Sequence, residues 1–408
     1  MTLKLTPTQL KGDVTPPPSK SQAHRAVIAA ALSKGKSHVA PLALSIDIKA
    51  TLDAVEVLGA SYDPATGIIE GMECQVTKRD GLPEIDCAES GSTLRFMIPI
   101  ALALCGGAVF SGRGRLMERP QDPYFEMFRE KGISYHKEGN TLTVRGTLPS
   151  GTYRLPGNVS SQFVTGLLFA LPMLRGDSEI QVVTPLQSQD YVAMTLDILD
   201  AFDVQVWQEE MQHFWIRGRQ HYKATNCKVE ADASQAAFFA TARALMNPVT
   251  ILGLNPESRQ GDKVIFSILK TLQGRGVQGI DMSQCPDLLP AVALAAALRE
   301  GEVTFLSNAA RLRAKESDRL AAVTRQLNAL GAEIKEGADF LEIRGVKRLK
   351  GGMVDSENDH RIAMMLAIAA TASDGDIILS GAESVQKSYP NFWSEYERLG
   401  GKITALEA

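Results

Sequence analysis

The sequence predicts an α/β protein of two domains, each built from three copies of one unit of helices and short strands. Its 408 residues are more than one hydrophobic core usually serves, which makes two domains the default. Amphipathic helical runs recur about every 70 residues, a period that suits a repeated supersecondary unit. An apolar, Ala-rich helical run accompanies each of them, so we expect a buried helical core sheathed by strands in each domain.

Each amphipathic run ends at a residue that tolerates the left-handed conformation in which helices commonly stop. Five runs end in Gly, and the third ends in Asp203, which tolerates that conformation moderately well. The interval from Gly276 to Gly331 is shorter than the others, at about 55 residues. The six runs occupy residues 51–59, 125–132, 195–203, 267–276, 323–331 and 392–400.

A second set of predicted helices is apolar around nearly the whole circumference, which is typical of buried helices. With three units in each domain, the chain should cross between domains around Asn226 to Asp232. The predicted buried helices occupy residues 21–35, 92–107, 160–174, 233–246, 288–301 and 360–373.

The composition excludes several classes of partner. A net charge of −4 gives no overall basic field to attract nucleic acid. The chain begins without an apolar signal segment, and its longest apolar stretch, the 15 residues from Phe96 to Phe110, is too short to span a membrane. The histidines show no metal-binding spacing. The cysteines stand singly, which predicts reduced thiols in a cytoplasmic protein; they are Cys74, Cys87, Cys105, Cys227 and Cys285.

The segment from Arg311 to Arg319 concentrates four cations and two carboxylates in nine residues. In a helix, Arg311, Lys315 and Arg319 would share one face, and stacked like charges favour a bound anion among them. The alternative is a solvated helix with pairs between Lys315 and Asp318 and between Glu316 and Arg319.

Polar residues gather where the predicted buried helices begin. Helix N-termini with free N–H groups favour anions, so cations and hydroxyls at several of them indicate a site for a substrate with several negative charges. If the two domains face each other, these helix starts converge on one cleft. The candidates are Lys20, Ser21, Arg25, Ser90, Gly91, Ser92, Thr93, Ser160, Ser161, Gln162, Asp287, His360 and Arg361, with Arg119, Ser188, Tyr191 and Lys387 nearby.

Nine motifs occur in one order along the chain: PSKSQAHRA, SGSTLR, ERP, SSQFVTGLL, a Ser-x-x-Tyr, PDLLP, RAKESDR, NDHR and KSYP. With these motifs the chain resembles the EPSP synthase (3-phosphoshikimate 1-carboxyvinyltransferase) family over essentially its whole length. The resemblance implies a two-domain inverse α/β barrel with three βαβαββ-type repeats per domain and buried helices. Residues 15–228 would form one domain, and residues 1–14 with 229–408 the other, with the active site in the cleft between them.

The implied reaction moves the carboxyvinyl group of phosphoenolpyruvate onto the 5-hydroxyl of shikimate 3-phosphate, within the shikimate pathway to chorismate and the aromatic amino acids. It gives 5-enolpyruvylshikimate 3-phosphate and phosphate through a tetrahedral adduct, without metal or cofactor. We expect a cytoplasmic monomer whose partners are these two small molecules, not nucleic acid or a membrane.

The resemblance also assigns residues. Asp287 and Glu316 would transfer protons, with Asp287 as the base on the hydroxyl, Glu316 as the acid on the methylene carbon and Lys20 as a rival base. Shikimate 3-phosphate would be held by Lys20, Ser21, Arg25, Ser160, Ser161, Gln162, Ser188, Tyr191, Asp287, Arg311 and Lys315. Phosphoenolpyruvate would be held by Lys20, Gly91, Arg119, Gln162, Arg319, Arg361 and Lys387, with His360 and Glu89 also in the active site.

Three residues depart from the family pattern. Glu89 stands where an Asn usually precedes the Ser-Gly pair, and it would repel phosphoenolpyruvate unless it faces Arg or Lys. Ser92 replaces a common Thr, and Arg311 stands where an Asn often contacts shikimate 3-phosphate, so that it either adds a phosphate contact or points outward. Gly91 is retained, which implies inhibition by glyphosate.

Two alternatives remain open from the residues. One is the sister enolpyruvyl transferase acting on UDP-N-acetylglucosamine, which usually carries a Cys in the loop before Arg-Pro; the segment SGRGRLMERP has none. The other is a non-catalytic polyanion-binding protein on the same repeats, which would need the cations but neither Asp287 nor Glu316.

Overall fold

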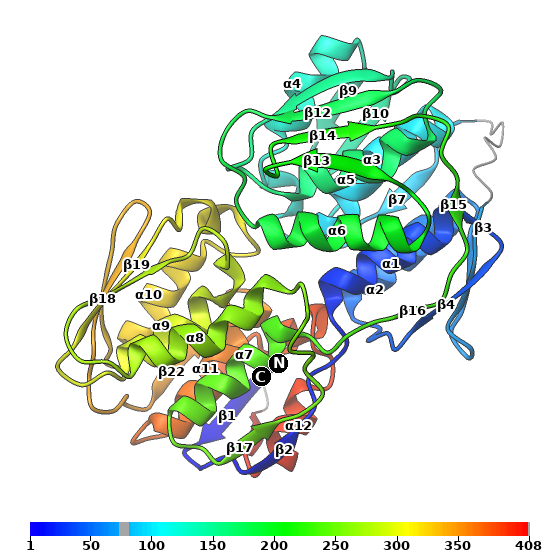
Figure 1. The fold of residues 1–408 in the computed structure, drawn as a ribbon. Helices are drawn as coiled ribbons and strands as arrows, with labels where there is room; N and C mark the ends of the chain where they lie inside the picture. The colour runs from blue at the N-terminus through cyan, green and yellow to red at the C-terminus, as the bar shows by residue number, and fades with distance from the viewer. Residues whose placement is uncertain (73–80, 407–408) are drawn as a thin grey trace. The chain divides into compact units, whose positions relative to one another are not determined.

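The structure, a computed structural model, describes residues 1–72 and 81–406. The chain forms two compact units (Figure 1). The middle unit is Lys20–Val229, and the N/C unit joins Met1–Ser19 to Glu230–Ala408. Each unit has its own hydrophobic core, and each is described separately below. Cys74, which we predicted as a reduced thiol, lies outside the described residues.

The middle unit contains three four-stranded sheets with one strand order. In each sheet the first two strands are parallel and the hairpin that follows is antiparallel, as in β7-β8-β10-β9. Two repeats run continuously: β7 (Glu84–Asp86), α3 (Gly91–Cys105), β8 (Gly107–Ser111), α4 (Asp122–Lys131), β9 (Ser134–Glu138) and β10 (Thr141–Arg145), then β11 (Gly151–Leu155), α5 (Gln162–Ala170), β12 (Ser178–Val182), α6 (Gln189–Ala201), β13 (Val206–Glu209) and β14 (His213–Ile216).

The remaining repeat of the middle unit is closed by a strand from the far end of the unit. Its first strand, β16 (Cys227–Lys228), pairs in parallel with β4 in the sheet β16-β4-β6-β5. A two-residue pair, β3 (Ser33–Lys34) with β15 (Tyr222–Lys223), runs beside this closure. The other elements are α1 (Lys20–Leu32), β4 (Lys36–Ala40), α2 (Ile46–Leu58), β5 (Ser61–Asp63) and β6 (Ile68–Glu70).

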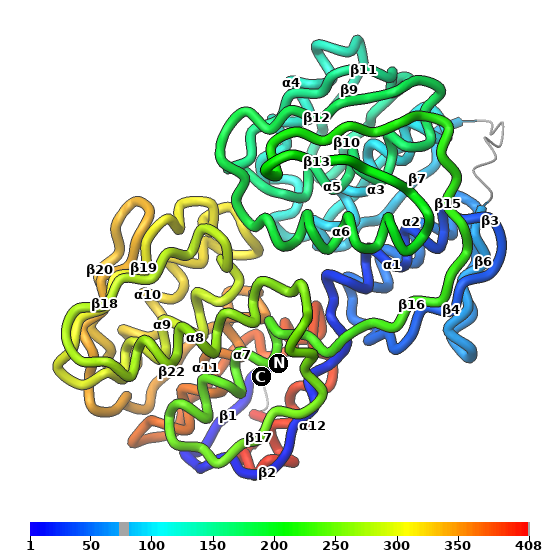
Figure 2. The backbone as a smooth tube through the Cα atoms, in the orientation of Figure 1, coloured from blue at the N-terminus to red at the C-terminus, as the bar shows by residue number. Residues whose placement is uncertain are grey.

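The N/C unit repeats the same pattern twice in full. Its sheets are β18-β19-β21-β20 and β22-β23-β1-β24, and the N-terminal strand β1 (Thr2–Thr6) pairs with β24 (Lys402–Leu406) near the C-terminus (Figure 2). The other elements are β18 (Gln278–Asp281), α9 (Leu289–Ala297), β19 (Val303–Ser307), α10 (Arg319–Ala329), β20 (Glu333–Glu336), β21 (Leu341–Arg344), β22 (Gly352–Asp355), α11 (His360–Ala369), β23 (Ile377–Ser380) and α12 (Phe392–Arg398).

The third repeat of the N/C unit is shortened. It comprises β2 (Gly12–Val14), α7 (Ala233–Ala244), β17 (Val249–Ile251) and α8 (Ile265–Leu272), and its sheet has two strands. Residues 273–277, all of them described, connect α8 directly to β18 without the hairpin found in the other repeats. This missing hairpin accounts for the short interval from Gly276 to Gly331. The α/β fold class is confirmed, with one of the six repeats abbreviated.

All six predicted buried helices form, as α1, α3, α5, α7, α9 and α11. In the N/C unit α7, α9 and α11 pack against one another, and in the middle unit α3 packs closely against α5. In α9 and α11 every residue is buried, as expected of helices that are apolar on all sides.

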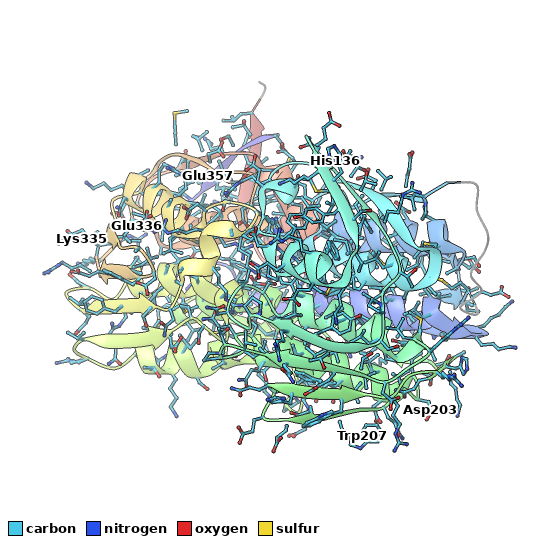
Figure 3. The ribbon with its side chains drawn as sticks, turned by 90° about the horizontal axis from the view of Figure 1, so that it is seen from above. His136, Asp203, Trp207, Lys335, Glu336 and Glu357 are labelled. Atoms are coloured by element: carbon cyan, nitrogen blue, oxygen red, sulfur yellow. The ribbon has the colours of Figure 1, made fainter. Side chains whose placement is uncertain are left out.

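The six predicted helix stops all have a positive φ. The angles are 119° at Gly59, 67° at Gly132, 63° at Asp203, 83° at Gly276, 87° at Gly331 and 96° at Gly400. Gly59 and Gly132 directly follow their helices, and Asp203, Gly331 and Gly400 come two residues after the last helical residue. The exception is α8, which ends at Leu272, four residues before Gly276. Asp203, labelled in Figure 3, forms an exposed ion pair with Lys223, and its short polar side chain tolerates a conformation that Gly adopts more readily.

Candidate functional site

The start of α1 in the middle unit holds a lysine and an arginine in fixed positions. The Lys20 ammonium group forms a salt bridge of 2.6 Å with Asp47 of α2. Asp47 is a buried residue in the first turn of its helix, and the sequence analysis did not identify it. The ion pair therefore joins the starts of two neighbouring helices and orients Lys20 between them.

Arg25 brings together three of the predicted residues. Its guanidinium donates to the Thr195 hydroxyl at 2.8 Å and to the Ser21 carbonyl at 2.7 Å, and it lies over the rings of Phe96 and Tyr191. Burial lowers the pKa of Arg25 to about 10, which still leaves it charged at neutral pH. A buried cation packed between aromatic rings is well placed to bind an anionic group.

A second group of predicted residues meets at Gly91, the first residue of α3. A methyl group built on Gly91 would lie 3.0 Å from an Arg119 nitrogen and 3.5 Å from the Gln162 side-chain oxygen. Gln162 accepts from Arg95 at 2.8 Å and donates to the Ser92 hydroxyl at 3.0 Å. Arg119 and Arg95 are both buried. Two guanidinium groups therefore converge on the bare backbone of Gly91, a geometry suited to an anion.

The predicted serines of the middle unit lie at two helix starts. The Ser160 hydroxyl accepts from the backbone of Gln162 at 3.3 Å, and Ser161 is the residue before α5. Ser188 precedes α6 in a left-handed conformation, with φ of 56°. Tyr191 donates its backbone N–H to the Ser188 carbonyl. This short turn fixes the spacing of the Ser-x-x-Tyr motif.

Glu89 precedes the cap of α3. Ser90 caps the helix by accepting from the Thr93 N–H at 3.1 Å. The Glu89 carboxylate is partly buried and lies against Gly114, in a loop that also carries Arg113 and Arg115.

The segment from Arg311 to Arg319 differs from the predicted helix. Residues Ala310–Ala314 form a short 3₁₀ helix, Lys315 is extended, and α10 begins only at Arg319. The Asp318 side chain accepts from the Ala321 N–H at 3.2 Å, and this cap sets the start of α10. The single-face stack of Arg311, Lys315 and Arg319 was therefore a wrong prediction.

The alternative pairing within this segment is half confirmed. Arg319 pairs with Glu316 at 2.7 Å, as predicted. Lys315 pairs instead with Asp287, at 3.3 Å, and Asp318 pairs with Arg313, at 3.0 Å. Because Lys315 is extended, its side chain turns away from Asp318.

A buried network of ion pairs, which we call the Asp287 cluster, lies at the starts of α10 and α11 in the N/C unit. Arg319, with 1% of its side chain exposed, contacts three carboxylates: Asp287 at 2.7 Å, Glu316 at 2.7 Å and Asp359 at 2.8 Å. Asp287 also contacts Lys315 at 3.3 Å and Arg361 at 3.1 Å. The members of the cluster are Asp287, Lys315, Glu316, Arg319, Asp359 and Arg361.

Charges within the cluster perturb its ionisation. Burial alone would raise the pKa of Asp287, but the positive charges of Arg361, Lys315 and Arg319 outweigh it and hold the pKa well below its usual range. Burial lowers the pKa of Lys315, and Asp287 opposes that effect. Asp287 is therefore a carboxylate at all moderate pH values, surrounded by three cations that could also bind a substrate.

Three further predicted residues border the cluster. Lys387 is buried and donates to the Asn358 carbonyl at 2.6 Å, just before α11. His360 is the buried first residue of α11. Arg311 donates to the carbonyl of Ser283, which ties its loop to the segment before Asp287. Arg311 therefore makes a structural contact inside its own unit.

The sequence analysis missed Arg95, Asp47 and Asp359 as members of these sites. Asp359 caps α11 by accepting from the Arg361 N–H at 2.9 Å, and it also holds Arg319. Its place directly before a buried helix was a signal that it caps the helix. Its bond to Arg319, 40 residues away, depends on tertiary structure and had no signal in the sequence.

No group of His, Cys, Asp or Glu in residues 1–72 and 81–406 has the arrangement of a metal site. Within the same ranges no helix is both long and apolar enough to cross a bilayer.

The fold places the chain among the two-unit α/β proteins that include enolpyruvyl transferases. The solved enolpyruvyl transferase NikO from Streptomyces tendae shares the fold, with a TM-score of 0.79 at 17% identity over 100% of this chain and 99% of that one. EPSP synthase from Acinetobacter baumannii also superposes with a TM-score of 0.79, at 26% identity over 99% of this chain and 100% of that one.

Sequence comparison identifies the family. The EPSP synthase (3-phosphoshikimate 1-carboxyvinyltransferase) family model matches residues 5–396. The 3-phosphoshikimate 1-carboxyvinyltransferase of Clostridium acetobutylicum is 47% identical over 98% of both chains, and that of Clostridium kluyveri is 44% identical over 98% of both. The chain belongs to the EPSP synthase family.

Proposed function

We propose that this protein transfers the carboxyvinyl group of phosphoenolpyruvate to the 5-hydroxyl of shikimate 3-phosphate, releasing phosphate. The match to the family extends over nearly the whole chain and supports this activity. The observation that supports it most in the site is that Asp287 and Glu316 contact the same buried guanidinium, that of Arg319. Addition and elimination across a vinyl group require two groups that exchange protons within one site.

Shikimate 3-phosphate is bound, in this proposal, mainly by the start of α1 and its neighbours. Arg25 supplies a buried charge for the phosphate, and Lys20 and Ser21 stand at the start of the same helix. Tyr191 packs on the Arg25 guanidinium, which fixes its plane. Ser160, Ser161, Gln162 and Ser188 add hydrogen-bonding groups, and Asp287 and Lys315 act on the substrate from the N/C unit.

Phosphoenolpyruvate is bound by guanidinium and ammonium groups. Arg119 at Gly91 would contact one end of the molecule, with Arg95 holding Gln162 in place. Arg319, Arg361 and Lys387 are the cations proposed from the N/C unit. Arg311 stays among the residues proposed for shikimate 3-phosphate, because its hydrogen bond to the Ser283 carbonyl involves one of the five N–H donors of the guanidinium.

The proton transfers follow from the two carboxyls. Asp287 accepts the proton of the 5-hydroxyl while Glu316 donates one to the methylene carbon, and the directions reverse when phosphate leaves. In the unliganded cluster Asp287 is a weak base, because three cations stabilise its charge. Anionic substrates that bind Arg361 and Lys315 would offset these cations and increase the proton affinity of Asp287.

We further propose that the protein is a cytoplasmic monomer with reduced cysteines. The four described cysteines, Cys87, Cys105, Cys227 and Cys285, form no disulfide among the described residues. Burial raises the pKa of the Cys285 thiol to about 12, which makes it unreactive.

The activity itself is tested by phosphate release. We expect turnover of phosphoenolpyruvate with shikimate 3-phosphate, and at least about a thousandfold lower kcat/KM with UDP-N-acetylglucosamine, since a site built for one polar substrate rejects another steeply. Inhibition by glyphosate, competitive with phosphoenolpyruvate, is expected in the same assay. Preference for UDP-N-acetylglucosamine would replace the proposed activity with that of the sister enzyme. Binding of both substrates without phosphate release would favour a polyanion-binding protein.

Replacing Gly91 with alanine is expected to raise the KM for phosphoenolpyruvate on the order of tenfold with a smaller change in kcat. The added methyl group would lie 3.0 Å from Arg119, so that this side chain must shift. The matched control is Gly279→Ala in β18, where an added methyl group meets no atom within 4 Å. An unchanged KM in Gly91→Ala would remove Gly91 from the proposed binding site.

A further inference from the structure

A chain of buried hydrogen bonds crosses the middle unit from α1 through α2 to α3. The His24 Nδ1 atom lies 2.7 Å from the Thr51 hydroxyl, which lies 2.7 Å from the Thr93 hydroxyl. The Thr93 hydroxyl donates to the Ser90 hydroxyl at 2.7 Å. These four residues, which we call the His24 chain, are at most 1% exposed, and the mechanism proposed above uses none of them. A hydrogen-bonded polar network inside a core specifies one arrangement of the helices that carry it.

The hydrogen bonds of the His24 chain run in one direction. A hydroxyl group has a single hydrogen to donate. Thr93 gives its hydrogen to Ser90, so the Thr51 hydroxyl must donate to Thr93 to form the contact of 2.7 Å. The Asp47 carbonyl is a more distant acceptor for the Thr51 hydroxyl, at 3.5 Å. Because Thr51 uses its hydrogen in this way, the Nδ1 atom of His24 must carry a hydrogen and donate it to Thr51.

The other ring nitrogen of His24 supports the same direction. Nε2 is buried, and within the part of the chain that the structure describes it has no hydrogen-bond partner. Burial, together with the charges of Lys20 and Arg25, holds the pKa of His24 well below its usual value, so the ring is neutral and carries one hydrogen. If the bonds ran the opposite way, that hydrogen would be on Nε2 and would be a buried donor without an acceptor, which is rare and costly.

One end of the His24 chain fixes the backbone at which Arg119 lies. Ser90 caps α3 by accepting from the Thr93 N–H at 3.1 Å, in addition to the bond from the Thr93 hydroxyl. Gly91 follows as the first residue of α3, and a methyl group built on it would lie 3.0 Å from an Arg119 nitrogen. Two bonds from Thr93 to one cap therefore hold the start of α3 in place.

The other end of the chain ties this helix start to that of α1. His24 stands one turn after Lys20 in α1, and Thr51 stands one turn after Asp47 in α2. The Lys20–Asp47 ion pair and the His24–Thr51 hydrogen bond join α1 to α2 at two successive turns. The bond from Thr51 to Thr93 then joins α2 to α3. The position of α3 relative to Lys20 is thus set by side chains within one core.

We propose that the His24 chain, with the imidazole hydrogen on Nδ1, positions the backbone of Gly91 against Lys20 and so determines how tightly phosphoenolpyruvate binds. Its members are positioning residues, which act on the substrate only through the start of α3. The inference rests on the function proposed above, which assigns Lys20 and Gly91 to phosphoenolpyruvate. A displacement of about 1 Å at a binding group can cost up to about a hundredfold, so even a small shift of α3 has a measurable effect.

The kinetic test compares Thr93→Val, which has a similar size but no hydroxyl, with Thr93→Ser, which keeps the hydroxyl. We expect Thr93→Val to raise the KM for phosphoenolpyruvate about three- to tenfold with kcat within about twofold of the wild type, because binding weakens without loss of a reacting group. Thr93→Ser should stay within about twofold of the wild type in both parameters. Thr51→Val and Thr51→Ser should repeat this pattern from α2.

The KM for shikimate 3-phosphate distinguishes positioning from a general loss of structure. It should change by less than about twofold in all four variants, because Arg25 is held by the Thr195 hydroxyl and the Ser21 carbonyl, outside the His24 chain. The matched control is Thr241→Val in the N/C unit, which removes a buried hydroxyl bond of 3.4 Å from α7 to the Ala291 carbonyl of α9. This variant should lose stability without raising either KM.

Two kinetic results would overturn the proposal. One is an unchanged KM for phosphoenolpyruvate in both Thr93→Val and Thr51→Val. The other is an equal rise in the KM values of both substrates, which would show that the chain supports the middle unit as a whole. If Thr93→Val fails to fold, Thr51→Val and the tautomer of His24 in the wild-type protein decide the question.

A measurement without substrate keeps the inference separate from the proposed function. Nitrogen NMR of protein labelled in its histidine rings reports the tautomer, and His24 is identified as the ring whose signals move in Thr51→Ser. At pH 7 we expect Nε2, which couples to both carbon-bound hydrogens of the ring, to have the chemical shift of a bare nitrogen. A hydrogen on Nε2 would overturn the proposal, whereas the expected tautomer without any turnover would contradict only the proposed function.

Discussion

Replacing Arg319 with methionine is expected to destabilise the N/C unit by about 3–5 kcal/mol, because removing one partner of a buried ion pair leaves its partners uncompensated. In this variant three carboxylates lose the attraction of the guanidinium that they all contact. They are Asp287, Glu316 and Asp359. Arg319 is also among the largest fully buried side chains of the protein. Asp359 receives hydrogen bonds from two nitrogens of the Arg319 guanidinium, at 2.8 and 3.4 Å, and would lose both.

The measurement is denaturant unfolding followed by tryptophan fluorescence. The three tryptophans are Trp207 and Trp215 in the middle unit and Trp393 in the N/C unit. Changing the first two to phenylalanine leaves Trp393, whose indole donates to the Ala382 carbonyl, as the reporter of the N/C unit alone. The expected result is a lower unfolding midpoint with little change in slope.

The matched control lies on the same helix. Arg325 pairs with Glu357, labelled in Figure 3, through two bonds of 2.8 Å, but its side chain is 60% exposed. Arg325→Met should therefore cost at most about 1 kcal/mol. Similar losses for both variants would mean that the buried network contributes no more than a surface ion pair.

The second large effect concerns turnover. Asp287→Asn and Glu316→Gln are each expected to lower kcat by about 10²–10⁴-fold, because each removes one of the two proton-transfer groups. The KM for phosphoenolpyruvate should not rise in Asp287→Asn, since the change leaves Lys315 and Arg361 with more positive charge for the substrate. Phosphate release measured over a range of substrate concentrations separates the two parameters.

The control for Glu316→Gln is Glu333→Gln on β20, where the carboxylate is exposed and pairs with Arg344 at a distance of 4.0 Å. Its kcat should equal that of the wild type. A loss of less than about tenfold in both Asp287→Asn and Glu316→Gln would show that protons move through other groups, with Lys20 as the first alternative.

Local sequence patterns predict the helices of this protein, but they do not predict some of the strands in its sheets. Periodicity and breakers predict all six buried helices, and even the shortened repeat appears in the sequence as a short interval before Gly331. Strands such as β16, only two residues long, have no local pattern, because their position is set by pairing with β4 almost 190 residues away.

The sequence predicts which residues form the site more completely than it predicts how these residues are arranged. Asp287, Glu316, Arg319 and Arg361 do meet in one cluster, although the helix expected to align three cations begins only at the last of them, Arg319. The cap at Asp318 prevailed over the charge pattern, which had suggested a continuous helix. The role of Asp359 depends on its contact with Arg319, 40 residues away, and no rule of residue spacing predicts such a contact.

The pairing of β1 with β23 and β24 has a consequence for how the chain is made. Residues 2–6 leave the ribosome long before the strands on either side of them, residues 377–380 and 402–406. The whole middle unit is synthesised in the interval, with all the described segments of its own core already present. The strand β1 must therefore wait without these two partners until β23 and β24 have been synthesised.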